Sequence, residues 1–293
     1  MVYVHGISRH GTGYSNGWWA SLEPHLQGFY GDGALGQGRR EVLWSRIVNP
    51  DRAAAHDVLS ADDEAVRQMI QETIEDRALR ELPEQRSVTS RAVVQPPEVD
   101  ADIDRAAVAS GDGRVVADRL VATRGGGWSL DDFMLYMTQR NIRRAILDIF
   151  HGVMQTLANQ ERTEIDIICH SWGTVVTFEA LHETDRLPAG LNVANLFTVG
   201  AALSLAPVRW KLGLTRNPPP SVRRWYNLDA KGDPVGGGLK GAFNGVTEDY
   251  LSLTPVGCTA FLGFYGVGCA HSSYFKPDNL LVNRDIFARH ILE

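Results

Sequence analysis

The feature that most constrains the fold of this chain is a junction near its middle, where two apolar runs meet at a short turn. Residues 165–169 form a run rich in isoleucine, residues 170–173 read His-Ser-Trp-Gly, and a second apolar run starts at Thr174. A short run of this kind is typical of a buried strand, and the longer run after the turn is typical of a helix. The sequence therefore predicts a strand, a tight corner and a helix, with Ser171 at the apex.

A strand–turn–helix corner is a known way to hold a serine nucleophile beside a helix N-terminus. The positions two residues before and two residues after the serine must be small, because the strand and helix backbones pass close together there. Gly173 fills the second position, and Cys169 fills the first, where glycine is usual. Cysteine is small enough for the corner to form. Ser171 is therefore the candidate nucleophile, and its alternative role is that of a helix N-cap.

Residue types that can activate a serine follow it along the chain. A predicted strand at residues 222–228 leads into a turn with two carboxylates, Asp229 and Asp233, and His271 follows a later apolar segment. The order serine, aspartate, histidine is the one used by hydrolases with this kind of corner. His271 would accept the proton of Ser171 and return it to a leaving alcohol, while the aspartate would hold the imidazole tautomer.

Each of these residues also has a structural interpretation. His271 could be a buried, hydrogen-bonded histidine, and Asp233 could be the turn former of an Asp-Pro pair. Asp229 lies four positions before Asp233, and either carboxylate could reach the histidine. His290, the other histidine after these acids, lies near the end of a predicted C-terminal helix, where a cation is favourable for a separate reason.

The N-terminal segment supplies a candidate oxyanion hole. A predicted strand at residues 2–5 runs into a glycine that lets the loop turn. The backbone N–H of Ile7 would then point toward the serine and form a two-donor hole with the N–H of Trp172. We interpret His5 as a residue that orients this loop, and His170 as structural.

Strands and helices alternate along most of the chain, which predicts an α/β fold with a mainly parallel sheet covered by helices on both faces. The predicted strands are 2–5, 40–48, 164–169, 193–199 and 222–228, and the predicted helices are 16–28, 61–82, 129–159, 172–184 and one from about 278. With 293 residues, 44% of them hydrophobic, the chain can form one domain over residues 1–293.

The main interruption of this alternation is a predicted insertion or cap at about residues 51–128. Its first part is helical, and the rest is rich in glycine and proline with few aromatic residues. A segment of this length without regular structure is often functional. It would either lie over the site as a lid or form a remote surface elaboration.

Composition excludes several classes of function. The net charge of −6 without a basic cluster gives no electrostatic case for nucleic-acid binding. No histidine spacing typical of a metal site is present, so we expect no metal. Residues 251–275 contain no Asp, Glu, Lys or Arg, but Pro255 and several glycines interrupt them, so we expect no transmembrane segment.

The three cysteines do not make a disulfide framework, although Cys258 and Cys269 could pair. We therefore expect a reduced, cytoplasmic protein, because the sequence also shows no secretory signal. The sequence leaves the oligomeric state open.

The chain resembles bacterial α/β-hydrolases of the serine esterase and lipase type, and more distantly the lipase-like GPI-inositol-deacylase branch. The resemblance lies in residues 4–7, 132–146, 169–173, 224–227 with 233–235, and 270–274, and it fails over about 51–128. It implies an α/β-hydrolase fold without its first two edge strands, and a catalytic triad of Ser171, Asp233 and His271. It favours Asp233 over Asp229, since the match falls on Asp-Pro-Val.

The function that this resemblance implies is hydrolysis of a small-molecule or lipid ester through an acyl-enzyme intermediate, without a cofactor. The alternatives are hydrolysis of a thioester or an amide, and a binding or effector module that kept the fold and lost turnover. The natural substrate and its acyl-chain length stay open.

Overall fold

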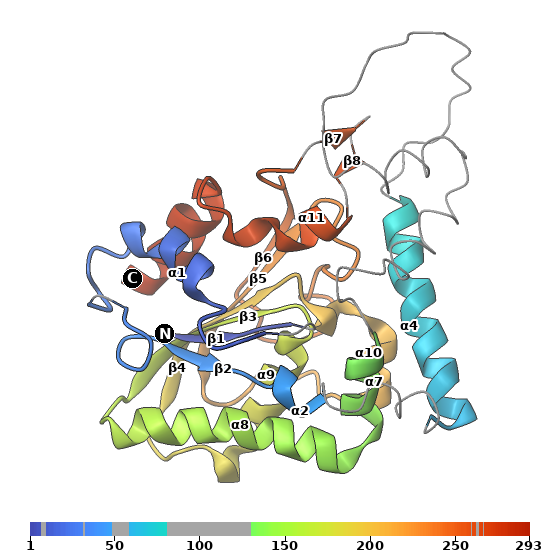
Figure 1. Ribbon diagram of the computed structural model, residues 1–293, viewed down its shortest axis with the longest axis horizontal. Coiled ribbons are helices and arrows are strands. Elements are labelled where there is room, and N and C mark those ends of the chain that lie inside the picture. The colour runs from blue at the N-terminus through green and yellow to red at the C-terminus, as the bar shows by residue number, and fades with distance from the viewer. Residues whose placement is uncertain are drawn as a thin grey trace, which may run out of the picture.

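The centre of the molecule is a six-stranded sheet in which all strands are parallel (Figure 1). This computed structural model describes residues 1–6, 10–31, 33–48, 59–80, 130–258, 260–261, 264–265 and 267–293. The strands are β1 (Val2–Val4), β2 (Arg40–Val42), β3 (Glu164–His170), β4 (Asn192–Val199), β5 (Val222–Ala230) and β6 (Glu248–Leu253). Their order across the sheet is β2-β1-β3-β4-β5-β6. The predicted α/β fold with a parallel sheet is thus confirmed.

Helices cover both faces of the sheet because successive strand side chains point to opposite sides. In β1, Val2 and Val4 belong to one hydrophobic core, whereas Tyr3 belongs to the other. The first core includes residues of α8 (Arg140–Asn159) and α9 (Gly173–His182). The second includes residues of α1 (Asn16–Leu22) and of the C-terminal helices η5 (Leu281–Ala288) and α12 (Arg289–Leu292), on the opposite side of the sheet in Figure 1.

Three predicted elements differ from the observed ones. The predicted helix 129–159 is two helices, α7 (Leu130–Thr138) and α8, which are separated at Gln139 by an extended backbone with φ −102° and ψ 104°. The predicted strand 40–48 ends at Val42, and its second half forms the short helix α2 (Ser45–Val48). The predicted helix 16–28 consists of α1 and the 3₁₀ turn η1 (Glu23–His25), because Gln27 and Gly28 adopt positive φ.

Several elements were not predicted as they occur. These are the 3₁₀ turns η2 (Thr184–Arg186), η3 (Ala202–Ser204) and η4 (Ser273–Phe275), the helices α10 (Ala206–Leu212) and α11 (Val267–Ser272), the edge strand β6, and the two-stranded pair β7 (Ala260–Phe261) and β8 (Phe264–Tyr265). All residues of β6 are exposed or half-buried, and its sequence lacks the apolar run by which central strands are found. Among the described residues, no helix is long and apolar enough to cross a membrane.

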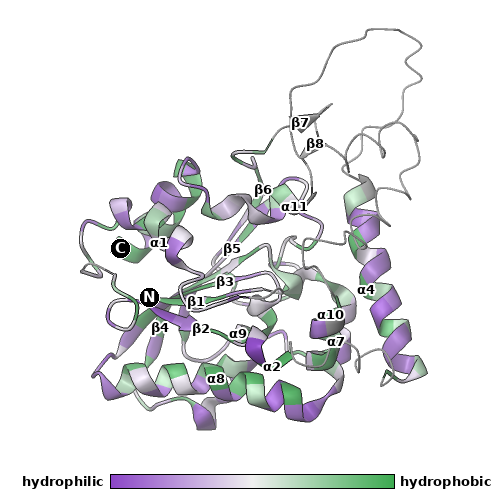
Figure 2. Cartoon of the chain, in the orientation of Figure 1, coloured by the Kyte–Doolittle hydropathy of each residue, from purple (hydrophilic) through white to green (hydrophobic). Residues whose placement is uncertain are grey.

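The described part of the predicted insertion is the helix α4 (Ala61–Arg80), close to the predicted bounds 61–82. Hydrophilic and hydrophobic residues are interspersed along it (Figure 2). Its buried side chains recur every four residues, at Val66, Ile70, Ile74 and Ala78. This stripe lies on one helix face, and α4 contacts α7 and α10. The remainder of the predicted insertion, residues 51–58 and 81–128, lies outside the described residues.

The expectation of reduced cysteines is wrong for two of the three. Cys258 and Cys269 form a disulfide with their Cα atoms 5.8 Å apart. Folding brings the loop after β6 next to α11, so the pairing depends on a tertiary approach that sequence spacing does not reveal. Cys169 is a free, buried thiol.

Candidate active site

Ser171 lies at the turn between β3, which ends at His170, and α9, which begins at Gly173. Its φ of 56° is left-handed, a conformation that costs an L-residue about 1–2 kcal/mol. One backbone and one side-chain donor hold it there: Ser171 N donates to Val199 O at 2.9 Å, and Thr174 Oγ1 donates to Ser171 O at 2.7 Å. Backbone strain of this kind clusters at functional sites.

The small residues around the turn are required by close backbone approaches. A Cβ on Gly173 would lie 2.3 Å from His5 O, and a Cβ on Gly6 would lie 2.5 Å from Ser171 Cβ. Cys169 is fully buried between β1 and β4, and its Sγ donates to Phe197 O at 3.3 Å. Cysteine therefore fits the position where glycine is usual. Burial raises the pKa of the Cys169 thiol to about 12, so the group is a neutral core side chain.

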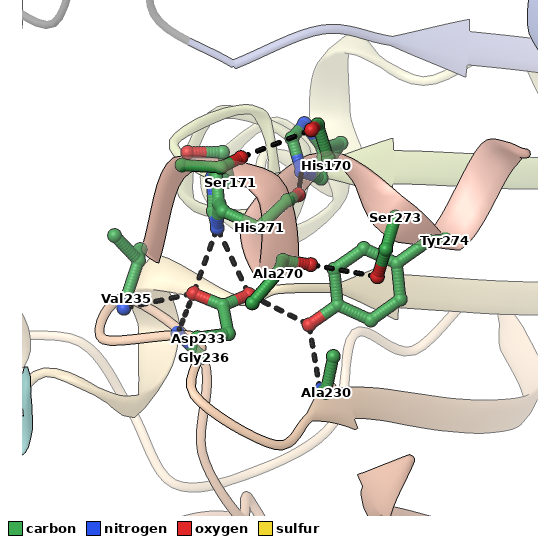
Figure 3. A network of polar contacts seen from close by, with 12 residues as sticks. His170, Ser171, Ala230, Asp233, Val235, Gly236, Ala270, His271, Ser273 and Tyr274 are labelled. Atoms are coloured by element: carbon green, nitrogen blue, oxygen red, sulfur yellow. Dashed lines mark hydrogen bonds and ion pairs between the residues drawn. The ribbon is translucent and has the colours of Figure 1, made fainter. Parts of the chain in front are cut away.

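His271 is hydrogen-bonded to Asp233, the acid favoured by the sequence resemblance. His271 Nδ1 lies 2.8 Å from Asp233 Oδ1 and 2.9 Å from Oδ2, and both side chains are buried (Figure 3). Since a carboxylate only accepts, the proton is on Nδ1 and Nε2 is the basic nitrogen of the ring. Asp229 lies within β5, which extends to Ala230, whereas Asp233 lies in the turn after it and is the carboxylate that bonds Nδ1.

Asp233 is kept ionised by donors that converge on it. Val235 N and Gly236 N donate to Oδ1 at 2.9 and 3.1 Å, and Tyr274 Oη donates to Oδ2 at 2.6 Å (Figure 3). Burial alone would raise the pKa of Asp233, but the charge of His271 and these hydrogen bonds outweigh it and lower the pKa to about 2. The site therefore holds a fixed negative charge behind the imidazole.

His170 connects the serine turn to the histidine. Its Nε2 donates to His271 O at 2.8 Å, and the two ring centroids are 4.4 Å apart. Burial, and secondly the charge of His271, lower the pKa of His170 to about 3, so this ring stays neutral. The geometry agrees with the structural role predicted for it.

Gly200, at the end of β4, lies against the aspartate–histidine pair. A Cβ there would come within 2.7 Å of Asp233 Oδ2 and 3.1 Å of His271 Cε1. The preceding residue, Val199, accepts the backbone hydrogen bond of Ser171. The serine after β3 and the aspartate after β5 thus lie at the carboxyl ends of parallel strands, and His271 of α11 lies beside them (Figure 3).

Only one of the two predicted oxyanion donors lies in the described part of the chain. Trp172 precedes α9, so its backbone N–H is at a helix N-terminus, where amides have no acceptor within the helix. Its indole is buried and stacks on Phe133 with centroids 3.7 Å apart. Ile7 lies outside the described residues. Within those residues, no cluster of three or more His, Cys, Asp or Glu side chains could hold a metal ion.

Two residues near the site were not predicted to contribute to it. Tyr274 bonds the aspartate directly, and Arg77 of α4 bonds the loop at Val235 and Gly236. A tyrosine three positions after the candidate histidine was a visible signal for the first. Nothing local in the sequence indicates the second, since Arg77 and Gly236 are 159 positions apart.

Comparison of the chain with protein-family models, with curated proteins and with solved structures found no match. The resemblance to the α/β-hydrolases therefore stays a prediction, and the case for a function rests on the geometry of the site.

Proposed function

We propose that the protein is a serine hydrolase of the α/β-hydrolase type that cleaves a carboxylic ester through an acyl-enzyme intermediate. The observation that carries this proposal is the buried hydrogen-bonded pair of Asp233 and His271 beside a serine in a left-handed turn. An N-cap serine does not need a positive φ, because N-cap residues adopt extended conformations. A nucleophile at a strand-to-helix corner does occupy a strained turn.

The arrangement of strands supports the fold part of the proposal. Ser171 follows β3, Asp233 follows β5 and His271 lies beyond β6, which is the chain order expected of this class. A hydrolase core that lacked the two edge strands at its start would consist of parallel strands like these.

In the proposed reaction, Ser171 Oγ attacks the ester carbonyl carbon while His271 Nε2 takes its proton. The backbone N–H of Trp172 donates to the developing oxyanion. The ester C–O bond then breaks, and His271 returns the proton to the departing alcohol. Water, deprotonated by the same nitrogen, hydrolyses the acyl-serine and restores the enzyme. Asp233, with its low pKa, stabilises the imidazolium in both steps.

The aromatic side chains near the site support an apolar acyl group in the substrate. Trp18 stacks on Phe275 with centroids 3.8 Å apart and lies edge-on to His170 at 5.7 Å. We expect p-nitrophenyl esters of longer chains to be hydrolysed with a higher kcat/KM than the acetate. A clear preference for the acetate would contradict the apolar acyl site.

One observation favours a second candidate, a binding or effector module without turnover. Ser171 and His271 each expose only 3% of their surface, so a substrate reaches the hydroxyl only after neighbouring residues move. A thioester or an amide remains the alternative substrate within the hydrolase proposal.

A fluorophosphonate probe distinguishes the two candidates, because it reacts covalently with an activated serine. We expect the probe to label the wild type and the Ser273→Ala variant and not Ser171→Ala. Ser273 is the matched control: it is buried near the site and its Oγ donates to Ala270 O at 2.8 Å. A folded wild type that stays unlabelled would favour the binding module. Labelling that persists in Ser171→Ala would place the nucleophile elsewhere.

A further inference from the structure

The inserted helix α4 reaches the candidate active site through one side chain, that of Arg77. Its Nη1 donates to Ser204 Oγ at 2.7 Å, to Val235 O at 3.2 Å and to Gly236 O. Its Nη2 donates to Ser204 O at 3.1 Å. A single guanidinium therefore joins the loop after β4 to the loop after β5.

The loop after β5 is the one that holds the aspartate. Val235 and Gly236, whose carbonyl oxygens accept from Arg77, use their own N–H groups to bind Asp233 Oδ1, as Figure 3 shows for the aspartate side. Ser204 Oγ adds a bond to Val235 O at 2.9 Å. The guanidinium thus holds the carbonyl oxygen of the Val235–Gly236 peptide, whose N–H bonds the carboxylate, and also the next carbonyl, Gly236 O.

The loop after β4 lies against the serine turn. It contains η3, and Ala202 N at the start of that turn donates to Ser171 O at 3.4 Å. Ser204 ends the same 3₁₀ turn and is bonded twice by Arg77. Arg77 therefore contacts the 3₁₀ turn that bonds the candidate nucleophile and the loop segment that bonds the candidate acid.

The helix that carries Arg77 is anchored independently of it. The buried stripe of Val66, Ile70 and Ile74 packs α4 on the main core, and Lys211 of α10 bonds Asp63 near the start of α4. Arg77 lies three positions after Ile74, on the same side of the helix. The Arg77 side chain therefore extends to the two loops from a helix that other contacts hold in place.

We propose that Arg77 is a positioning residue for Asp233, so that the inserted helix contributes to the geometry of the site. This inference rests on the proposed function. Hydrogen bonds from a charged guanidinium to carbonyl oxygens are stronger than neutral ones, and a two-nitrogen fork can hold two loops at a fixed separation. Without the guanidinium, the segment Val235–Gly236 loses its anchor, and the carboxylate shifts relative to His271.

The test compares Arg77→Met and Arg77→Lys with Lys211→Met as the matched control. Lys211→Met removes a cation that also anchors α4, but its contact with Asp63 is remote from the aspartate loop. We expect Arg77→Met to lower kcat for a p-nitrophenyl ester by about 10- to 100-fold with little change in KM, as a misplacement of about 1 Å does. Arg77→Lys should recover part of this loss, and Lys211→Met should keep the wild-type kcat.

A second readout does not need turnover: the downfield proton resonance of His271 Nδ1–H in its hydrogen bond to Asp233. We expect it to move upfield or broaden in Arg77→Met and to be unchanged in Lys211→Met. If the wild type hydrolyses no ester, the proposed function fails, and this resonance still tests the role of Arg77. A wild-type resonance in folded Arg77→Met would overturn the inference.

If Arg77→Met does not fold, the Arg77→Lys variant tests whether Arg77 positions Asp233. A lysine ammonium keeps the charge but has a single nitrogen in place of the two-nitrogen fork. The resonance should shift and kcat should fall in this variant. Wild-type values of both would contradict the positioning role.

Discussion

At the scale of the residue, Ser171 adopts a left-handed backbone conformation that is unfavourable for a residue with a β-carbon. A left-handed φ suits glycine, and a β-carbon at this site carries a steric cost. Gly6 relieves the crowding by leaving room against Ser171 Cβ. A serine at a position better suited to glycine supports the proposed role of its hydroxyl.

This strain predicts the relative stability of two variants that both lack the hydroxyl. We expect Ser171→Gly to be more stable than Ser171→Ala by about 1 kcal/mol, because glycine adopts the left-handed conformation without the steric cost of a β-carbon. Urea unfolding of both variants at the same pH measures the difference. Equal midpoints, or a more stable alanine variant, would show that the turn is not strained.

At the scale of the element, the candidate histidine lies in a short helix that a disulfide and hydrogen bonds connect to other segments. His271 is in α11, which has only six residues and is too short to be stable alone. The disulfide from Cys269 ties it to the loop after β6, and His271 O accepts from His170. Tyr274, in the following turn η4, bonds both Asp233 and Ala230 N.

The disulfide should therefore stabilise the protein measurably. It closes a loop with a sequence separation of 11, for which chain entropy gives about 3 kcal/mol. We expect the double variant Cys258→Ser/Cys269→Ser to unfold at a lower urea concentration than the oxidised wild type. Wild type treated with a reductant should have the same midpoint as the double variant. An unchanged wild-type midpoint after reduction would contradict the prediction.

At the scale of the whole molecule, the sheet separates two hydrophobic cores, and the site lies at the carboxyl ends of its strands. The buried ionisable residues Asp233 and His271 lie there, and loop amides and Tyr274 donate hydrogen bonds to the carboxylate. A buried charge is tolerated only where it is paired and hydrogen-bonded. The global stability of the fold is therefore linked to the ionisation of the site.

This linkage predicts an acid-dependent stability. The pKa of Asp233 falls from 3.8 to about 2 on folding, so the unfolded state binds more protons between these values. The stabilisation from the ionised group is complete above about pH 4 and is lost as the pH falls toward 2; it amounts to roughly 2 kcal/mol.

The measurement is the difference in unfolding free energy between wild type and Asp233→Asn, followed from pH 5 to pH 2. Because carboxyl groups elsewhere titrate in both proteins, their contribution cancels, and the difference reports the pair of Asp233 and His271. It should shrink as the pH is lowered through this window. A difference that is constant with pH would show that the pKa of Asp233 is not depressed in the folded state.

How much of the molecule could be predicted from its sequence depends on the range of the interactions involved. The central strands β3, β4 and β5 and the helix α4 were predicted close to their observed bounds. Each has an apolar run or a helical composition that is complete within a few residues. The edge strand β6 was missed because it lacks the apolar run of a central strand, and the break at Gln139 was missed because no glycine or proline marks it in the sequence.

The sequence by itself determined the corner at Ser171, since the small residues, the strand and the helix that form it are contiguous. Only the tertiary structure decided that Asp233 rather than Asp229 binds His271, that Cys258 pairs with Cys269, and that Arg77 reaches the aspartate loop. The physical reason is that hydrogen bonds and disulfides depend on distances of a few ångströms. For residues far apart in the sequence, those distances are set by how strands and helices pack and not by the number of residues between them.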